Sequence, residues 1–456
     1  MNDLSTSEIL SAPWLEESLA RVDATPRFVS SGRIIRVIGQ VVESSSLPVA
    51  VGEVCRIALG EGREIMAQTV GFHKGGVLLM PLGELIGIRP EATVTPLGRP
   101  FYARTGDELI GRVINGLGHP IDGNGPIHAT QRRSLSSPRT NPLERSPIRA
   151  PLGTGVRAID GLLTLGQGQR IGIMAGSGVG KSVLLGMIAR RTTADVNVIA
   201  LLGERGREVR EFIERDLGTE GLSRSVVVVA TSDEPAVVRG TGALLATTIA
   251  EHFRDSGRNV LLIMDSVTRV AMAWREIGLA VGEPPTTKGY PPSVFAALPR
   301  LLERAGTAKI GSITGLYAVL VEGDDFNEPI ADATRSILDG HIVLSRLLAN
   351  AKHFPAIDIL QSVSRVRDAV IDAGHLEAAN AILRLQAAYQ SHEDLISVGA
   401  YKPGVDPQVD TAVAFQSQIR AYLCQDTEDS SDFTDARTRL KRLSLAVNKQ
   451  MKGGGA

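Results

Sequence analysis

The sequence has few aromatic residues, only two cysteines and no long apolar run, and each shortage excludes a class of protein. Cys55 and Cys424 lie far apart, so they build neither a disulfide framework nor a zinc site and fit small hydrophobes in a reducing cytosol. No apolar run approaches the roughly 20 residues that span a bilayer, and residues 1–20 lack the basic start and apolar middle of a signal peptide. We therefore expect a cytoplasmic protein.

An excess of charge of one sign is also missing. The chain has 49 basic and 50 acidic residues, a net charge of −1, which argues against a globally basic nucleic-acid binder. Its 456 residues exceed what one hydrophobic core normally supports, so two or three domains are expected. The 48 glycines and the low aromatic content of 4% are typical of α/β layers with many tight turns.

The first quarter of the chain predicts two parts. Apolar residues recur near a helical period within residues 3–22, although Pro13 interrupts them, so residues 1–25 form either a helix on its own domain or a docking segment for a partner. Residues 26–95 are rich in short β-type pieces separated by Gly, Pro and Ser, which predicts a small β-barrel domain. The pieces are 32–43, 54–59, 64–70 and 76–81.

Residues 96–365 alternate strand-like and helical runs, which predicts a mostly parallel sheet covered by helices on both faces. The strand-like runs are 170–175, 196–202, 225–230, 259–265 and 311–321. Helical signals then take over in residues 366–456, as in 367–390 and 432–449. The predicted fold class is therefore α/β, with an N-terminal β-barrel, a central domain with a mostly parallel sheet and a C-terminal helical domain.

A glycine-rich loop at 175–182 joins a strand to a helix, which is the context of a P-loop. Its glycines let backbone N–H groups close around phosphate oxygens, Lys181 places a cation on the β- and γ-phosphates, and Ser182 offers a hydroxyl to Mg²⁺. Ala175 stands where the strict pattern has glycine, and the alternative is a glycine-rich turn without a ligand. The predicted nucleotide-binding residues are Gly176, Ser177, Gly178, Val179, Gly180, Lys181, Ser182 and Val183. ATP and Mg²⁺ are the expected ligands.

Two carboxylates follow strands of the same predicted sheet. Asp265 ends a run of aliphatic residues and is expected to hold the water shell of Mg²⁺, with a helix N-cap as the alternative role. Glu204 is the first acidic residue after the run 196–202, where a carboxylate can orient water for attack on the phosphate. Arg205 beside it is placed to contact the γ-phosphate, and the alternative is a solvated, salt-bridged helix start.

Seven motifs together resemble the type III secretion ATPases, which serve flagellar export and virulence injectisomes and are similar to the catalytic subunits of rotary ATP synthases. The resemblance runs from the barrel to about residue 407. The motifs are AGSGVGKS (175–182), GERGRE (203–208), IMDSVTR (263–269), GEPPTTKGYPPS (282–293), EGDD (322–325), ILDGHIVLSR (337–346) and FPAIDILQSVSR (354–365).

The resemblance implies a RecA-type nucleotide domain, a homohexamer and specific roles for residues. It makes Lys181, Glu204 and Arg205 catalytic, and places on Arg365 the arginine that reaches into a neighbour's site, with Arg367 as a competing choice. Phe354 falls on the aromatic that stacks on adenine, where the synthase relatives have tyrosine; a plain core role is its alternative.

The resemblance also implies partners. These are a peripheral stator-like regulator at the N-terminus, a central coiled-coil stalk, secretion chaperones with their export substrates, and the export gate at the inner membrane, where the ring is peripherally associated. The C-terminal domain is the expected seat of the chaperone complexes and the stalk, with Glu393 and Asp394 facing the stalk. No nucleic-acid partner is expected.

Three other functions compete with protein export. A Rho-like hexameric RNA translocase needs a basic barrel that stacks bases, yet residues 27–95 contain only Phe28 and Phe72 as aromatics. A non-catalytic ring subunit lacks a water-orienting carboxylate, which Glu204 supplies here. A catalytic subunit of a rotary ATP synthase needs a separate arginine donor, whereas this chain carries Glu204 and Arg365 together. The motifs do not separate flagellar from injectisome export.

Overall fold

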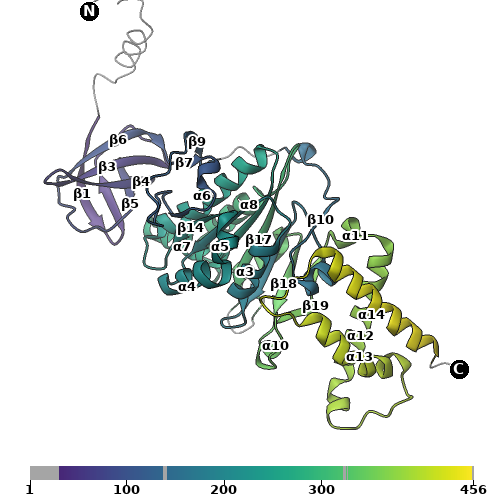
Figure 1. The fold of residues 1–456 in the computed structure, drawn as a ribbon. Helices are drawn as coiled ribbons and strands as arrows, with labels where there is room; N and C mark the ends of the chain where they lie inside the picture. The colour runs from purple at the N-terminus through teal and green to yellow at the C-terminus, as the bar shows by residue number, and fades with distance from the viewer. Residues whose placement is uncertain (1–29, 137–140, 322–324, 326, 454–456) are drawn as a thin grey trace, which may run out of the picture. The chain divides into compact units, whose positions relative to one another are not determined.

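The computed structural model describes residues 30–136, 141–321, 325 and 327–453 (Figure 1). The chain forms two compact units, the first ending at Phe101 and the second beginning at Tyr102. The predicted docking segment, residues 1–25, lies outside the described residues.

The first unit is a closed antiparallel barrel with the strand order β1-β2-β5-β4-β3-β6. Alternate side chains of each strand fill its interior, including the predicted small hydrophobe Cys55, which is fully buried. The piece 32–43, predicted as one run, is a hairpin that turns at Gly39, whose φ of 56° suits glycine. The strands are β1 (Gly32–Ile38), β2 (Val41–Ser44), β3 (Glu53–Gly60), β4 (Arg63–His73), β5 (Gly76–Pro81) and β6 (Thr93–Pro100).

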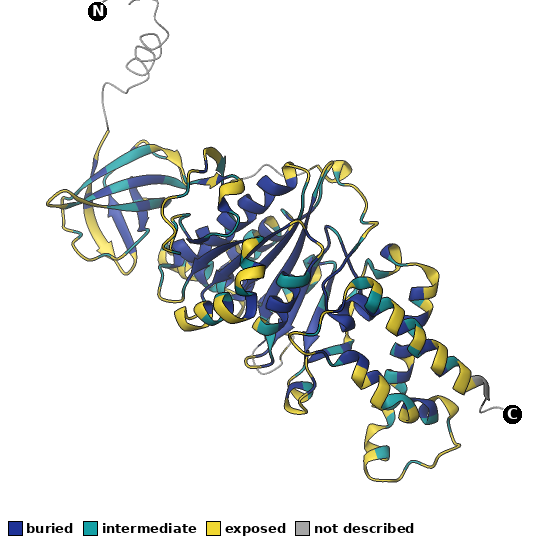
Figure 2. Cartoon of the chain, viewed as in Figure 1, coloured by how far each residue is buried: buried dark blue, intermediate teal, exposed yellow. Residues whose placement is uncertain are grey.

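The second unit is built on a nine-stranded sheet with the order β19-β18-β12-β17-β15-β13-β14-β8, in which β16 pairs with β17. All its pairs are parallel except β18–β19 and β16–β17. Its central strands are buried because helices cover both faces (Figure 2). The strands are β8 (Val113–Asn115), β12 (Arg170–Ala175), β13 (Val196–Leu202), β14 (Ser225–Ala230), β15 (Asn259–Asp265), β16 (Gly306–Thr307), β17 (Ser312–Leu320), β18 (Gly340–Leu344) and β19 (Ile357–Ser364).

Helices follow most strands of this sheet. The sheet helices are α3 (Lys181–Arg191), α4 (Gly206–Glu211), α5 (Gly218–Ser223), α6 (Ala236–Asp255), α7 (Val267–Ala280), α8 (Pro292–Leu302), α9 (Pro329–Ile337) and α10 (Arg346–Asn350). Shorter elements are β7 (Tyr102–Thr105) paired with β9 (Gln131–Ser134), β10 (Pro151–Leu152) paired with β11 (Leu165–Gly166), and the single turns η1 (Asp107–Leu109), η2 (Pro142–Glu144), η3 (Ile159–Leu163), η4 (Phe212–Leu217) and η5 (Thr287–Gly289).

The described chain beyond β19 is helical, which confirms the predicted fold class. The predicted helix 367–390 is two helices, because the first helix ends before Asp372. The Asp372 carboxylate caps α12 by accepting a hydrogen bond from His375 N. The helices are α11 (Arg367–Val370), α12 (Ala373–Ser397), α13 (Pro407–Leu423) and α14 (Phe433–Gly453), and the last three pack together. Among the described helices, none has the length and apolarity to cross a bilayer.

Candidate active site at the carboxyl edge of the sheet

The P-loop connects β12 to α3 and forms one wall of a cavity of about 520 Å³. Gly178 and Gly180 have φ of 77° and 89°, backbone conformations that a side chain disfavours, so glycine is required there. Val179 is buried beneath the loop instead of facing the cavity. The cavity is lined by Ala175, Gly176, Ser177, Gly178, Gly180, Lys181, Ser182, Val183, Glu204, Arg205, Glu208, Arg269, Leu320, Val321 and Arg346.

Three charged groups that the sequence predicts for the nucleotide site meet at this edge: Lys181 and Glu204 for catalysis and Asp265 for Mg²⁺. The Lys181 ammonium lies 3.5 Å from Glu204 Oε1 and also contacts Asp265 Oδ1. Asp265 ends β15 and Glu204 follows β13, and these two strands are hydrogen-bonded neighbours. The N-cap alternative for Asp265 is wrong, because the side chain of Ser266 caps α7 by accepting from Arg269 N.

Burial sets the protonation behaviour of this cluster. Burial raises the pKa of Glu204 above its ordinary value, and the charge of Lys181 opposes that shift only in part. Burial alone lowers the pKa of Lys181, but the nearby charges of Asp265 and Glu204 outweigh it, so the Lys181 pKa is raised. The lysine therefore stays charged, and a carboxylate of raised basicity stands beside it.

Arg205 lies at the rim of the cavity. Its side chain is 81% exposed and lies 3.6 Å from Glu208. Arg205 is the N-cap residue of α4, so the salt-bridged helix start that was its alternative describes Arg205 as well as Arg207 and Arg210, which pair with the glutamates four residues on. Arg205 has the freedom to turn toward a phosphate, since its one ion pair is exposed and weak.

The ring of Phe354 lies beside the P-loop. Its Cε1 stands 3.6 Å from the position that a Cβ on Gly180 would occupy. The side chain is 41% exposed, which excludes the plain core role that was its alternative. An exposed aromatic face next to a phosphate-binding loop suits stacking on a base.

The structure separates the two candidate finger arginines. Arg367 donates to Leu162 O, Asn380 Oδ1 and Asp368 Oδ1, so its guanidinium is held within its own chain. Arg365 is exposed after β19, and its side chain forms no hydrogen bond or ion pair with any residue that the structure describes. It is also absent from the walls of its own chain's cavity.

Sequence reasoning missed Arg269 and Arg346, which both line the cavity. The Arg269 side chain packs where a Cβ on Gly203 would stand, next to Glu204, and its buried Nε has no hydrogen-bond partner in the described part of the chain. The signal was present, because Arg269 lies one helical turn after Asp265 in a motif already quoted.

Models of known families match most of the chain. The ATP synthase alpha/beta family beta-barrel domain matches residues 34–98, the nucleotide-binding domain of the same family matches 155–364, and the T3SS EscN ATPase C-terminal domain matches 371–442.

Curated proteins and solved structures agree with these matches. A flagellum-specific ATP synthase of Bacillus subtilis is 53% identical, covering 93% of this chain and 97% of that protein. The chain belongs to the type III secretion ATPase family. A type 3 secretion system ATPase of Xanthomonas euvesicatoria is 49% identical over 92% of this chain and 94% of that protein. The assembled EscN ATPase of the enteropathogenic E. coli type III secretion system is 47% identical with a TM-score of 0.86, covering 91% of this chain and 100% of that one.

Because the chain belongs to the type III secretion ATPases, it is an ATPase. This membership argues against the alternative function of a Rho-like RNA translocase. The match of residues 371–442 to a secretion-specific domain also favours this family over the rotary synthase subunits.

Proposed function

We propose that the chain hydrolyses Mg²⁺-bound ATP at this cavity, as a homohexamer that energises type III protein export. The observation that supports the proposal best is the meeting of Lys181, Glu204 and Asp265 at the P-loop wall. A cation, a water-orienting carboxylate and a metal-side carboxylate are the set that phosphoryl transfer to water requires.

Each group has a distinct role in this proposal. The P-loop amides and Lys181 bind the phosphates, and Glu204 accepts a hydrogen bond from the attacking water, which aligns the oxygen with the phosphorus. Arg205 and Arg269 neutralise charge on the phosphate from the rim and from beside Gly203.

The site fits Mg²⁺ that is brought in by the nucleotide. In the described residues there is no group of three or more His, Cys, Asp or Glu that could hold a metal by itself. Mg²⁺ keeps several waters and is commonly bound by substrate phosphates plus one or two protein oxygens. Ser182 and Asp265 would supply those oxygens, Asp265 through water, and the bound ion would neutralise phosphate charge.

The ring completes the site. Arg365 is exposed and its side chain has no hydrogen bond or ion pair among the described residues, which suits a guanidinium that reaches the γ-phosphate bound by a neighbour. Solved structures of the EscN relative are titled as assembled, and one, 46% identical with a TM-score of 0.85, includes its central stalk EscO.

The same comparison supports a central stalk as a partner of this chain, and we propose that this stalk is a coiled coil. Glu393 and Asp394 are exposed on α12, where they are available to face it. We place the chaperone–substrate complexes on the C-terminal helices, and the ring on the cytoplasmic face of the export gate at the inner membrane.

Lys181→Ala is expected to lower Mg²⁺-dependent ATP turnover by about 10²-fold or more, because it removes the cation on the transferring phosphate and leaves two carboxylates facing it. Phosphate release at saturating ATP and Mg²⁺ measures the effect. Lys309→Ala is the matched control, since Lys309 is 74% exposed and only pairs with Glu144 at 3.8 Å. Turnover of Lys181→Ala equal to that of the control would contradict the proposed site.

Deleting residues 2–20 is expected to leave ATP hydrolysis intact and to abolish pull-down of the stator-like regulator, because the apolar residues of that segment need a surface to bury against. The measurement compares pull-down by the full chain and by the deletion variant at matched turnover. Unimpaired pull-down by the deletion variant refutes the docking role.

A further inference from the structure

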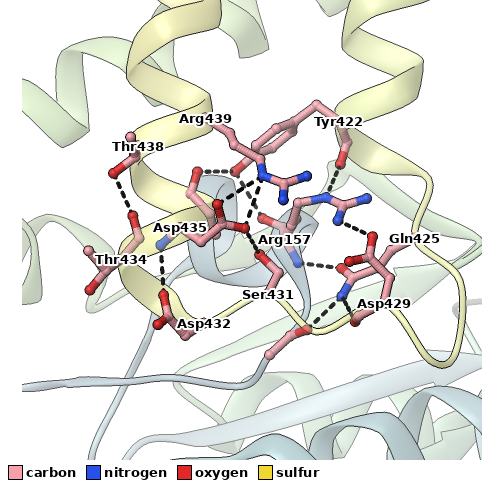
Figure 3. A network of polar contacts seen from close by, with 12 residues as sticks. Arg157, Tyr422, Gln425, Asp429, Ser431, Asp432, Thr434, Asp435, Thr438 and Arg439 are labelled. Atoms are coloured by element: carbon pink, nitrogen blue, oxygen red, sulfur yellow. Dashed lines mark hydrogen bonds and ion pairs between the residues drawn. The ribbon is translucent and has the colours of Figure 1, made fainter.

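The loop between α13 and α14, residues 424–432, belongs to the C-terminal helices but contacts the nucleotide-binding half of the same unit (Figure 3). It touches the segment that precedes η3, the C-terminal end of α3, and the backbone of Phe354. We refer to residues 424–432 as the clasp loop.

Arg157 anchors the clasp loop through its guanidinium. Nε donates to Tyr422 O at 3.0 Å, Nη2 donates to Cys424 O at 2.5 Å, and Nη1 pairs with the Asp429 carboxylate (Figure 3). The Arg157 side chain is only 4% exposed. A buried cation is costly unless its donors are paired, and here each guanidinium nitrogen has an acceptor, so the loop is tied firmly to this point.

Gln425 is the residue at which the contacts converge. Its Oε1 accepts from Arg157 N at 2.9 Å, and its Nε2 donates to Gly155 O at 2.8 Å and Asp429 O at 3.0 Å. Its own backbone N–H donates to Phe354 O at 2.9 Å. The side chain is 5% exposed, so the amide fixes the backbone N–H that holds the Phe354 carbonyl.

The C-terminal end of α3 is tied to the same loop. Arg190 donates to Thr427 O at 3.0 Å, and Arg191 donates to Asp429 O. Both arginines end α3, the helix that begins with Lys181. The clasp loop therefore bonds both to the helix that follows the phosphate-binding loop and to the residue whose ring lies beside it.

We infer that Gln425, held by Arg157, is a positioning residue that sets Phe354 for the base of the nucleotide, so that the C-terminal helices influence base binding through the clasp loop. The inference rests on the proposed stacking role of Phe354. The side chain of Phe354 is too exposed to be fixed by packing, so its backbone is where its position can be controlled. The competing view is that the clasp loop only fastens the C-terminal helices and has no specific effect on the base.

The two views differ in which part of the nucleotide is affected. We would measure dissociation constants of ATP and of tripolyphosphate, which lacks the base, for the full chain and for Gln425→Ala, Phe354→Ala and the double variant. Gln418→Ala is the matched control, because Gln418 is exposed on α13, the helix that leads into the clasp loop, and makes no side-chain hydrogen bond with the described residues. Thermal melting checks that each variant is folded.

Phe354→Ala and Gln425→Ala are each expected to raise the dissociation constant of ATP by about fivefold, the range of one lost aromatic contact. The dissociation constant of tripolyphosphate should change by no more than about twofold. In the Phe354→Ala background, Gln425→Ala should add little, because it acts through the ring that is already missing.

Three outcomes would overturn the inference while leaving the proposed function intact. Gln425→Ala could weaken the binding of ATP and of tripolyphosphate equally, it could have no effect on either, or its effect on ATP affinity could multiply with that of Phe354→Ala in the double variant. No effect of Phe354→Ala would instead remove the proposed stacking role and the inference with it. If Gln425→Ala does not fold, Asp429→Asn replaces it, since that change weakens only the ion pair with Arg157 at a partly exposed carboxylate. Asp429→Asn must then lower the affinity for ATP more than the affinity for tripolyphosphate, and an unchanged affinity for ATP overturns the inference.

Discussion

Glu204→Gln is expected to slow ATP turnover by about 10²–10⁴-fold while ATP still binds, because the amide keeps the shape of the side chain but accepts a hydrogen bond from the attacking water poorly. The carboxylate is only 16% exposed and lies 3.5 Å from the Lys181 ammonium, so it is held close to the cation that binds the phosphates. Single-turnover phosphate release and equilibrium binding of ATP separate the chemical step from binding.

The matched control for this change is Glu211→Gln. Glu211 lies on α4, close in sequence to Glu204, but it only pairs with Arg207 at the surface. Such exposed pairs contribute about 0–1 kcal/mol to stability and nothing to the chemical step. If Glu204→Gln turns over ATP as fast as Glu211→Gln, Glu204 has no place in the mechanism.

The central strands could be predicted from the sequence because parallel strands buried on both faces are continuous aliphatic runs. β12, β13, β14 and β15 match the predicted bounds, and β17 differs by one residue at each end. β18 and β19 were not predicted as strands. β19 pairs antiparallel at the edge of the sheet and alternates buried with exposed residues, so its pattern is weaker.

The cluster of Lys181, Glu204 and Asp265 was predictable for a topological reason, since carboxyl ends of parallel strands meet at one edge. Contacts that depend on the direction of side chains could not be predicted from the sequence. The motifs placed the finger on Arg365 with Arg367 as a competing choice, and the hydrogen bonds of Arg367 within its own chain favour Arg365. The backbone hydrogen bond from Gln425 to Phe354 joins two segments that are distant in the sequence, and no local sequence pattern indicates it.

Arg365→Ala is expected to lower turnover by about 10³–10⁵-fold and to leave nucleotide binding largely intact, because the guanidinium neutralises charge that develops on the transferring phosphoryl group. In contrast, Arg367→Ala should mainly lower thermal stability, since Arg367 bonds within its own chain to Leu162 and Asn380. A large loss of turnover on Arg367→Ala with none on Arg365→Ala would reverse the assignment of the finger.

If Arg365 acts in the active site of a neighbouring subunit, turnover must depend on assembly of the ring. Turnover per subunit of the unmodified chain should rise with protein concentration as rings form, because an isolated subunit lacks the arginine that its own cavity requires. Turnover per subunit that stays constant while sedimentation shows monomers converting to rings would contradict the need for a neighbour.

The central claim is that each active site takes Glu204 from one subunit and Arg365 from the next, and subunit mixing tests it most directly. Arg365→Ala and Glu204→Gln subunits, each inactive alone, are combined in equal amounts under conditions where mixed hexamers are demonstrated by mass. Roughly a quarter of the interfaces then pair an intact Glu204 with an intact Arg365, so activity should return well above that of either variant. Mixed hexamers that remain as inactive as the separate variants would contradict the claim.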